Sequence, residues 1–171
     1  MRPVARRIGA IASCLVLLAA CHGPQGEPAP GSAMALASAD APGAAVQGHD
    51  ACHLEWLGEI GAGEAFRARA GADVEARGWF ASIDRTGPAK SPVLRLIAPS
   101  GAVGLDVSLD ERMQRPDVAA ALDAEGAASA GFRQVFSLAG LAPGDYRLVL
   151  VDRVAAGEAV CDNGRTLVIT P

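Results

Sequence analysis

The 171-residue chain predicts an all-β sandwich with one short helix, preceded by a signal peptide and a disordered linker. Two observations support the fold. Short segments in the second two thirds of the chain alternate apolar and polar residues with a period of two, which is typical of half-buried strands. Glycine and proline separate these segments, so about eight short strands joined by tight turns are expected, as in a two-sheet sandwich.

The first 20 residues have the layout of an export signal. Three arginines precede the uncharged, largely apolar run 8–20, which ends in the small residues Ala19 and Ala20. This run is too short to span a bilayer comfortably but has the length of the apolar part of a signal peptide. We therefore assign 1–20 to a signal peptide rather than to a buried core helix.

Cys21 follows directly, and the run Leu18-Ala19-Ala20-Cys21 resembles the lipobox of bacterial lipoproteins. The resemblance implies that cleavage follows Ala20 and that the Cys21 thiol carries a diacylglycerol. Several acyl chains make a stable membrane anchor. The resemblance also favours the outer membrane, because His22 and not an aspartate follows the cysteine. A plain signal peptide cut near Ala20 is the alternative.

Residues 21–48 are predicted to be the lipidated cysteine and a flexible linker. Gly, Ala, Pro and Ser dominate this stretch, so it has too little apolar surface to offset the entropy of ordering. Removal of 1–20 lowers Lys plus Arg from 15 to 12 against 19 acids, which moves the formal charge from −4 to −7. Such an acidic chain argues against nucleic acid as a partner, since phosphate binding requires a basic patch.

The folded domain is expected to span 49–171. Cys52 and Cys161 lie near its two ends, and in an oxidising compartment such a pair is expected to form a disulfide. A metal site that adds His49 and His53 to the two cysteines is the alternative, but the spacing in HDACH matches no common zinc site. We therefore expect no metal and no cofactor.

The strands follow in order along this domain. The clearest alternation lies in 73–83, where Val74, Ala76, Gly78 and Phe80 share one face. The turn sequence Pro99-Ser100-Gly101 predicts a hairpin between its two flanking strands. The predicted strand segments are 64–70, 73–83, 92–98, 102–110, 132–138, 145–152 and 165–170.

The only helical candidate is 115–126. Pro116 suits its first turn, Asp117 its positive end, and Gly126 its stop. Arg115 and Asp117 are expected to form a local pair that holds this turn. The charged run LDERMQRPD, 109–117, is expected to form a solvated loop.

The run LAPGDY, 141–146, resembles the corner that enters a late strand in immunoglobulin and fibronectin type III sandwiches. The resemblance implies that Tyr146 is structural, with its ring buried and its hydroxyl bonded to backbone a few residues upstream. A wider similarity, over about 52–170, is to Ig-like modules of bacterial envelope proteins and membrane glycosyltransferases, and it implies no catalytic residues. Its most specific pieces are Gly78-Trp79, Arg115-Pro116-Asp117-Val118 and Gly131-Phe132.

The two tryptophans are candidates for the core or for a binding face. Trp79 is expected in the core, where a tryptophan of a sandwich usually packs, whereas Trp56 fits either place. Stacking on sugar rings requires an exposed aromatic side chain.

Together these features favour a non-catalytic, lipid-anchored module of the cell envelope that binds envelope proteins or glycans. None of the histidines that remain after cleavage is placed like a catalytic base, and the glycine-rich run 58–63 lacks the lysine of a phosphate-binding loop. A purely structural accessory subunit is the first alternative, and an enzyme with an unrecognised site is the second. A binding module should expose an aromatic or apolar patch on one sheet.

Overall fold

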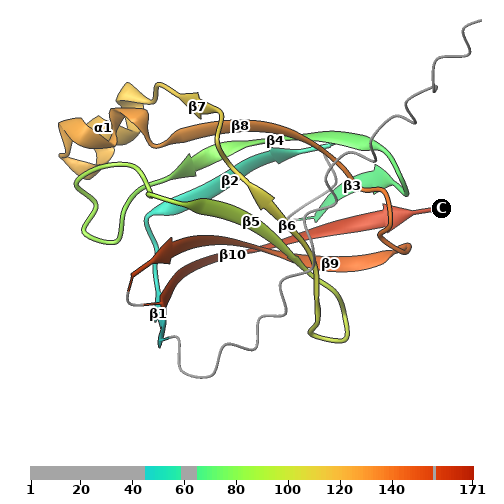
Figure 1. Ribbon diagram of the computed structural model, residues 1–171. Helices are drawn as coiled ribbons and strands as arrows, with labels where there is room; N and C mark the ends of the chain where they lie inside the picture. The colour runs from blue at the N-terminus through green and yellow to red at the C-terminus, as the bar shows by residue number, and fades with distance from the viewer. Residues whose placement is uncertain (1–44, 59–64, 156) are drawn as a thin grey trace, which may run out of the picture. The chain divides into compact units, whose positions relative to one another are not determined.

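The computed structural model describes residues 45–58, 65–155 and 157–171, which form two β-sheets and one short α-helix (Figure 1). The predicted signal peptide, Cys21 and the linker up to residue 44 lie outside the described residues, as does most of the run 58–63. Among the helices that are described, none has the length and apolar character needed to cross a membrane.

The larger sheet has the strand order β1-β10-β9-β5-β6, and β3 pairs with β10 on the edge that β1 also occupies. β1 and β3 run parallel to β10, whereas the other neighbours in this sheet are antiparallel. Its strands are β1 (Ala45–Gly48), β3 (Ala65–Arg69), β5 (Pro92–Ile97), β6 (Val103–Ser108), β9 (Gly144–Val154) and β10 (Gly157–Thr170).

The smaller sheet is antiparallel throughout and has the order β2-β4-β8-β7. Figure 1 shows these strands as a second layer, with α1 (Pro116–Leu122) at one end of it. Its strands are β2 (Cys52–Leu57), β4 (Asp73–Phe80), β7 (Arg112–Met113) and β8 (Gly131–Ser137).

The hydrophobic core lies between the two sheets, and both contribute to it. Phe80 and Phe132 of the smaller sheet and Leu94 and Leu150 of the larger sheet belong to one buried cluster. In β4 every second residue is buried, as the alternation in 73–83 predicts. The prediction of an all-β sandwich with one short helix is therefore confirmed.

The predicted hairpin is also present. β5 and β6 pair antiparallel, and the chain between them turns at residues 98–102. Within the turn, the amide of Ala98 donates to the carbonyl of Ala102 at 2.9 Å, and the amide of Gly101 donates to Ala98 at 2.8 Å. Gly101 has a φ of 84°, which glycine adopts without strain.

The strands differ from the predicted segments mainly in four places. Residues 52–57, which are not among the predicted strand segments, form β2 and pair with β4. Residues 45–48, assigned to the linker, form β1 and pair with the start of β10. β10 begins at Gly157, well before the predicted 165, with an irregularity between Cys161 and Arg165. Arg112–Met113 pair with β8 although a solvated loop was expected. Each of these segments is ordered by hydrogen bonds to a distant strand, which a local pattern does not show.

The helix begins as predicted but ends earlier. Pro116 occupies its first turn, and Asp123 ends it by adopting a left-handed conformation with φ of 52°. Gly126 is not the stop, since it lies inside the 3-10 helix η1 (Glu125–Ser129). A side chain at 126 would collide with the carbonyl oxygen of Thr86, so this glycine permits close packing of two loops.

Candidate binding surface

The outer side of the smaller sheet carries an exposed aromatic side chain among charged ones. We call it the Trp56 face and define it by the outward side chains of three strands. Trp56 is paired with Arg77, and Arg77 with Arg133, so these three residues form one row across β2, β4 and β8. Trp56 is 38% exposed and Val135 is 53% exposed. The residues of the Trp56 face are Glu55, Trp56, Glu75, Arg77, Arg133 and Val135.

A β-bulge in β2 places Trp56 on this face. The register shifts between Leu54 and Trp56, so Glu55 and Trp56 are both exposed whereas Leu57 returns to the core. In a regular strand, Trp56 would share the inward side with Leu54. The bulge therefore buries Leu57 and turns the indole outward.

Gly78 of β4 makes room for this bulge. A Cβ at position 78 would collide with the carbonyl oxygen of His53 and would lie 2.8 Å from Cζ of Phe132. The ring of Phe132, fully buried, thus covers the glycine from β8 while β2 approaches it from the other side. A side chain at this position would push the bulged strand away.

One carboxylate bridges the two arginines of the Trp56 face. Glu75 Oε1 accepts a hydrogen bond from Nε of Arg77, and Glu75 Oε2 accepts from Nε of Arg133 at 2.8 Å. These bonds, first that of Arg77 and then that of Arg133, hold the pKa of Glu75 below its usual value. Glu75 in turn raises the pKa of Arg133. Glu75 and Arg133 are therefore both charged at neutral pH.

The predicted pair of Arg115 and Asp117 forms at the start of α1. Nη2 of Arg115 lies 2.7 Å from Oδ2 of Asp117, and its Nη1 lies 2.8 Å from Oε1 of Glu55. The hydrogen bond from Arg115 lowers the pKa of Asp117 to about 2. Arg115 therefore ties the helix to the bulged strand, a contact that the sequence did not predict.

Trp79 lies elsewhere than the sequence predicts. It projects from the outer side of β4, half-buried, and not into the core between the sheets. There it packs against a second apolar cluster, which the short helices cover. The period-two alternation of β4 already placed Trp79 on the face opposite to that of Phe80. This alternation outweighs the general preference of tryptophan for the core. The buried residues of the second cluster are Ala51, Ala81, Ala127 and Ala130.

The predicted disulfide joins the two sheets. Cys52 of β2 and Cys161 of β10 are bonded, with their Cα atoms 6.3 Å apart. Their sulfur atoms therefore supply no thiolate to a metal. Within the described ranges, no group of three or more His, Cys, Asp or Glu residues is placed to hold a metal ion. The ring of His49 lies against Phe80, with Nε2 3.0 Å from the carbonyl oxygen of Ala81.

Tyr146 is buried at the start of β9. Its hydroxyl donates to the carbonyl oxygen of Ala142 at 2.9 Å, four residues upstream, and this is the hydrogen bond that a tyrosine corner requires. The ring packs closely on Gly104, where a Cβ would lie 3.0 Å from Cε1 of the tyrosine. Tyr146 is thus part of the scaffold and not of an exposed surface.

An ion network on the outer side of the larger sheet was not predicted. Arg95 of β5, 8% exposed, donates to Asp106 of β6 at 2.8 and 3.0 Å and to Glu158 of β10 at the same distances. Asp106 also accepts from Arg153 at 2.6 Å. The only local signal was a charged residue within an apolar strand. Because both carboxylates are engaged, this network cross-links strands and does not form an open site.

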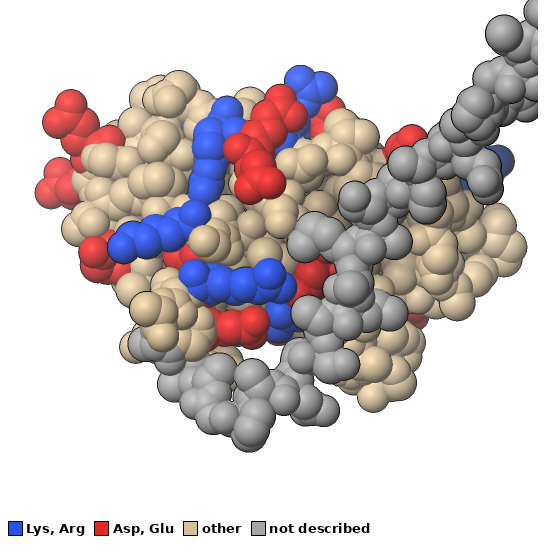
Figure 2. Space-filling view, in the orientation of Figure 1, with Lys and Arg blue, Asp and Glu red and all other residues tan. Residues whose placement is uncertain are grey.

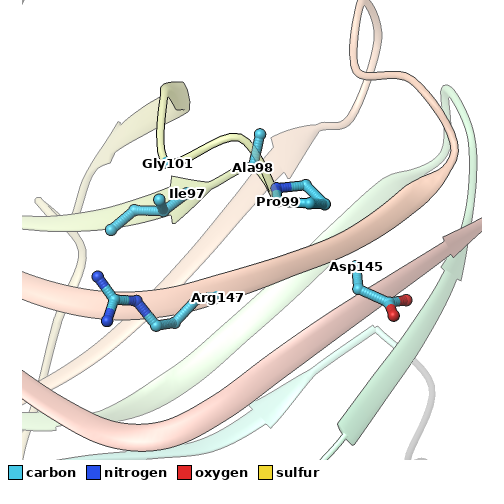
Figure 3. Close-up of a pocket in the computed structure, with 6 residues that line it drawn as sticks. All are labelled: Ile97, Ala98, Pro99, Gly101, Asp145 and Arg147. Carbon is cyan, nitrogen blue, oxygen red and sulfur yellow. The ribbon is translucent and has the colours of Figure 1, made fainter.

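Two shallow hollows lie elsewhere on the described surface. One, of about 270 Å³, lies beside the β5–β6 turn, where Asp145 and Arg147 extend in opposite directions along β9 (Figure 3). The other, of about 210 Å³, lies beside Lys90, Asp110 and Arg153. Neither hollow is lined by histidine.

The charges on the visible face of the domain are mixed in sign. Figure 2 shows basic and acidic side chains next to one another and not in separate regions. Among the described residues, opposite charges also pair closely, as Arg95 and Arg153 do with Asp106. The visible face therefore presents neighbouring charges of both signs and not a broad field of one sign.

Of the residues of the Trp56 face, the sequence singled out Trp56 alone as a candidate. The alternation in β4 places Glu75 and Arg77 outward, but only the pairing of β4 with β8 brings Arg133 next to them.

Comparison of the chain with protein-family models, curated proteins and solved structures finds no match.

Proposed function

We propose that the chain is a lipid-anchored, non-catalytic module of the cell envelope whose Trp56 face binds a glycan. The observation that supports binding most directly is the exposure of Trp56 on a sheet, beside arginine and glutamate side chains. A flat aromatic ring stacks on the apolar face of a sugar, and fixed charged groups beside it hydrogen-bond to the sugar hydroxyls.

A glycan fits this face better than a protein partner does. The core of a protein interface is depleted in Glu and Asp, whereas Glu55 and Glu75 lie beside Trp56 on this face. Here the row through the centre consists of Trp56, Arg77 and Arg133, so guanidinium groups flank the single ring. Their side chains are 51% and 45% exposed, which leaves their donors accessible to hydroxyl groups. A purely structural accessory subunit does not need such an exposed ring.

We further assign the sandwich to the immunoglobulin-like class. The assignment is supported by the disulfide between the sheets and by the bond from the Tyr146 hydroxyl to Ala142. In this class the sheets form a rigid scaffold, and a sheet face is then free to carry the binding residues.

The glycan proposal is tested by measuring retention of the full chain, in detergent, on peptidoglycan sacculi and on the purified polysaccharide part of lipopolysaccharide. Wild type should bind one of them, and Trp56→Ala should abolish the binding while Trp56→Phe keeps part of it. Ile83→Ala is the matched control, since Ile83 is also exposed, at 39%, but lies outside this face. Unchanged binding by Trp56→Ala at equal thermal stability would overturn the proposal, as would retention on neither polysaccharide.

The lipid anchor is tested separately, by acyl-chain labelling and detergent partitioning. Cys21→Ser should lose the label and leave the membrane fraction or accumulate uncleaved, because the lipid is carried by the thiol. Cys14→Ser is the control, since Cys14 lies inside the predicted signal peptide and should leave labelling unchanged. A wild-type chain without label would contradict the anchor.

A further inference from the structure

The two arginines of the Trp56 face are ion-paired to one shared carboxylate. Arg77 and Arg133 lie directly opposite each other on β4 and β8, an arrangement of like charges that destabilises a sheet. Among the described residues, Glu75 is the one carboxylate within ion-pair distance of either. Glu111 acts on Arg133 only through space. Arg77 and Arg133 therefore share a single paired carboxylate, while Glu55, the other glutamate of the face, pairs with Arg115.

The guanidinium of Arg77 also has donors to spare. Glu75 accepts a hydrogen bond from Nε of Arg77 and another from Nε of Arg133. Its Oε2 also lies 2.7 Å from Nη2 of Arg133. In the described part of the chain, Nη1 and Nη2 of Arg77 have no hydrogen-bond partner. These two nitrogens lie in the plane of the guanidinium group, and they can donate two parallel hydrogen bonds to the two oxygens of one carboxylate.

Trp56 lies directly across from Arg77 in the strand register. Side chains that are directly opposite on neighbouring strands have Cβ atoms roughly 4.5–5.5 Å apart. A sugar ring stacked on the indole therefore brings its ring substituents within reach of the free nitrogens of Arg77.

From this geometry, and on the basis of the glycan-binding function proposed above, we propose that the Trp56 face selects sugars that carry a carboxylate. Trp56 stacks on the ring, Arg77 receives the carboxylate, and Arg133 adds positive charge behind it. The chain as a whole is acidic, with a formal charge of −4, so overall charge does not attract such a ligand. The selection arises at contact, because charges farther away than about 8 Å are screened at physiological salt.

The test compares oligogalacturonate with its carboxyl-reduced, neutral counterpart, which has the same rings and linkages. Wild-type full chain in detergent should bind the acidic form roughly tenfold more tightly, as expected for charge-assisted hydrogen bonds. The preference should shrink in 1 M salt. The Arg77→Gln variant should bind the acidic and the neutral oligosaccharide with equal affinity. Arg147→Gln, which removes a similarly exposed arginine from the other sheet, should keep the preference.

The outcomes separate this inference from the broader function. Equal binding of both oligosaccharides by wild type, abolished for both by Trp56→Ala, overturns carboxylate selection and leaves the glycan function standing. Binding of neither oligosaccharide also overturns the inference, and the glycan function is then decided by the sacculus and polysaccharide experiment. The comparison of the two ligands on wild type requires no variant to fold.

Discussion

Tyr146 stabilises the domain through one partly buried hydrogen bond. Its hydroxyl meets the carbonyl of Ala142 before β9 begins, and its ring fills the space above Gly104. The bond closes the turn that carries the chain into the centre of the larger sheet. A phenylalanine keeps the ring in place but leaves the carbonyl of Ala142 without its partner.

We therefore expect Tyr146→Phe to lower the free energy of unfolding by roughly 0.5–1.5 kcal/mol, the net contribution of a typical hydrogen bond, because Ala142 is exposed and its carbonyl can bind water instead. Chemical denaturation measures the loss. Glycan binding below the melting transition should be unchanged, since Tyr146 is buried and not part of the Trp56 face. A variant of unchanged stability that no longer binds would contradict the scaffold role of this residue.

The pKa of Asp117 shows whether Arg115 donates a hydrogen bond to its carboxylate. The hydrogen bond from Arg115 brings the pKa of Asp117 to about 2, below its ordinary value of 3.8. Because the folded pKa is the lower one, the pair stabilises the fold above about pH 4, and this stabilisation is lost as the pH falls toward 2. Arg115→Gln should return the pKa toward 3.8, which carboxyl-carbon NMR measures. An unchanged pKa in this variant would show that Arg115 is not the cause.

Among the secondary-structure elements, β2 is the one whose irregularity shapes the candidate site. Its bulge sends Glu55 and Trp56 outward together, and Gly78 of the neighbouring strand allows the bulged backbone to approach. Glu55 then meets Arg115, so the same irregularity also ties down the start of α1. The position of Trp56 thus depends on a residue in another strand.

Gly78→Ala should destabilise the domain by about 1–3 kcal/mol, the usual cost of overpacking, because the methyl group collides with backbone. It should also weaken glycan binding, since the bulge must shift. Gly48→Ala in β1 is the matched control, as a Cβ there meets nothing within 4 Å. Thermal melting and sacculus retention measure both effects. If Gly78→Ala melted like the control, the bulge would not depend on this glycine.

On the scale of the whole molecule, the disulfide joins the two sheets covalently, in addition to the apolar core and to polar contacts such as the hydrogen bond from Asn163 Nδ2 to the carbonyl oxygen of Cys52 at 3.2 Å. It joins β2, near the start of the domain, to β10, at its end, across 109 residues of chain. A cross-link over so long a loop restricts the unfolded chain strongly. It also holds β2, and with it the Trp56 face, against the larger sheet.

Replacing both Cys52 and Cys161 by alanine should lower the free energy of unfolding by roughly 4–5 kcal/mol in the chain-entropy model. Denaturant titration measures the loss, and dithiothreitol should shift the wild-type transition in the same direction. The double variant should show no response to dithiothreitol, which serves as the internal control. Two free thiols at these positions in purified wild type would contradict the cross-link.

Much of the architecture could be predicted from local pattern alone. Period-two alternation identified the inward residues of β4, the turn at 99–101 identified the hairpin, and the two cysteines of the folded domain identified the disulfide. These features depend on neighbouring residues or on residue type, so a single sequence carries them. The order of the strands was not predicted, and β1 was assigned to the linker, because strand pairing joins residues that are distant in sequence.

The sequence by itself determined that the domain is an all-β sandwich, with Tyr146 at its corner and a cystine between its ends. Only the tertiary structure decided that Trp56 faces outward and that Arg77 and Arg133 share Glu75. A bulge moves every later side chain of its strand to the opposite face, and nothing in β2 alone marks where it occurs. The register between strands then selects which charges meet, and register is a property of the assembled sheet.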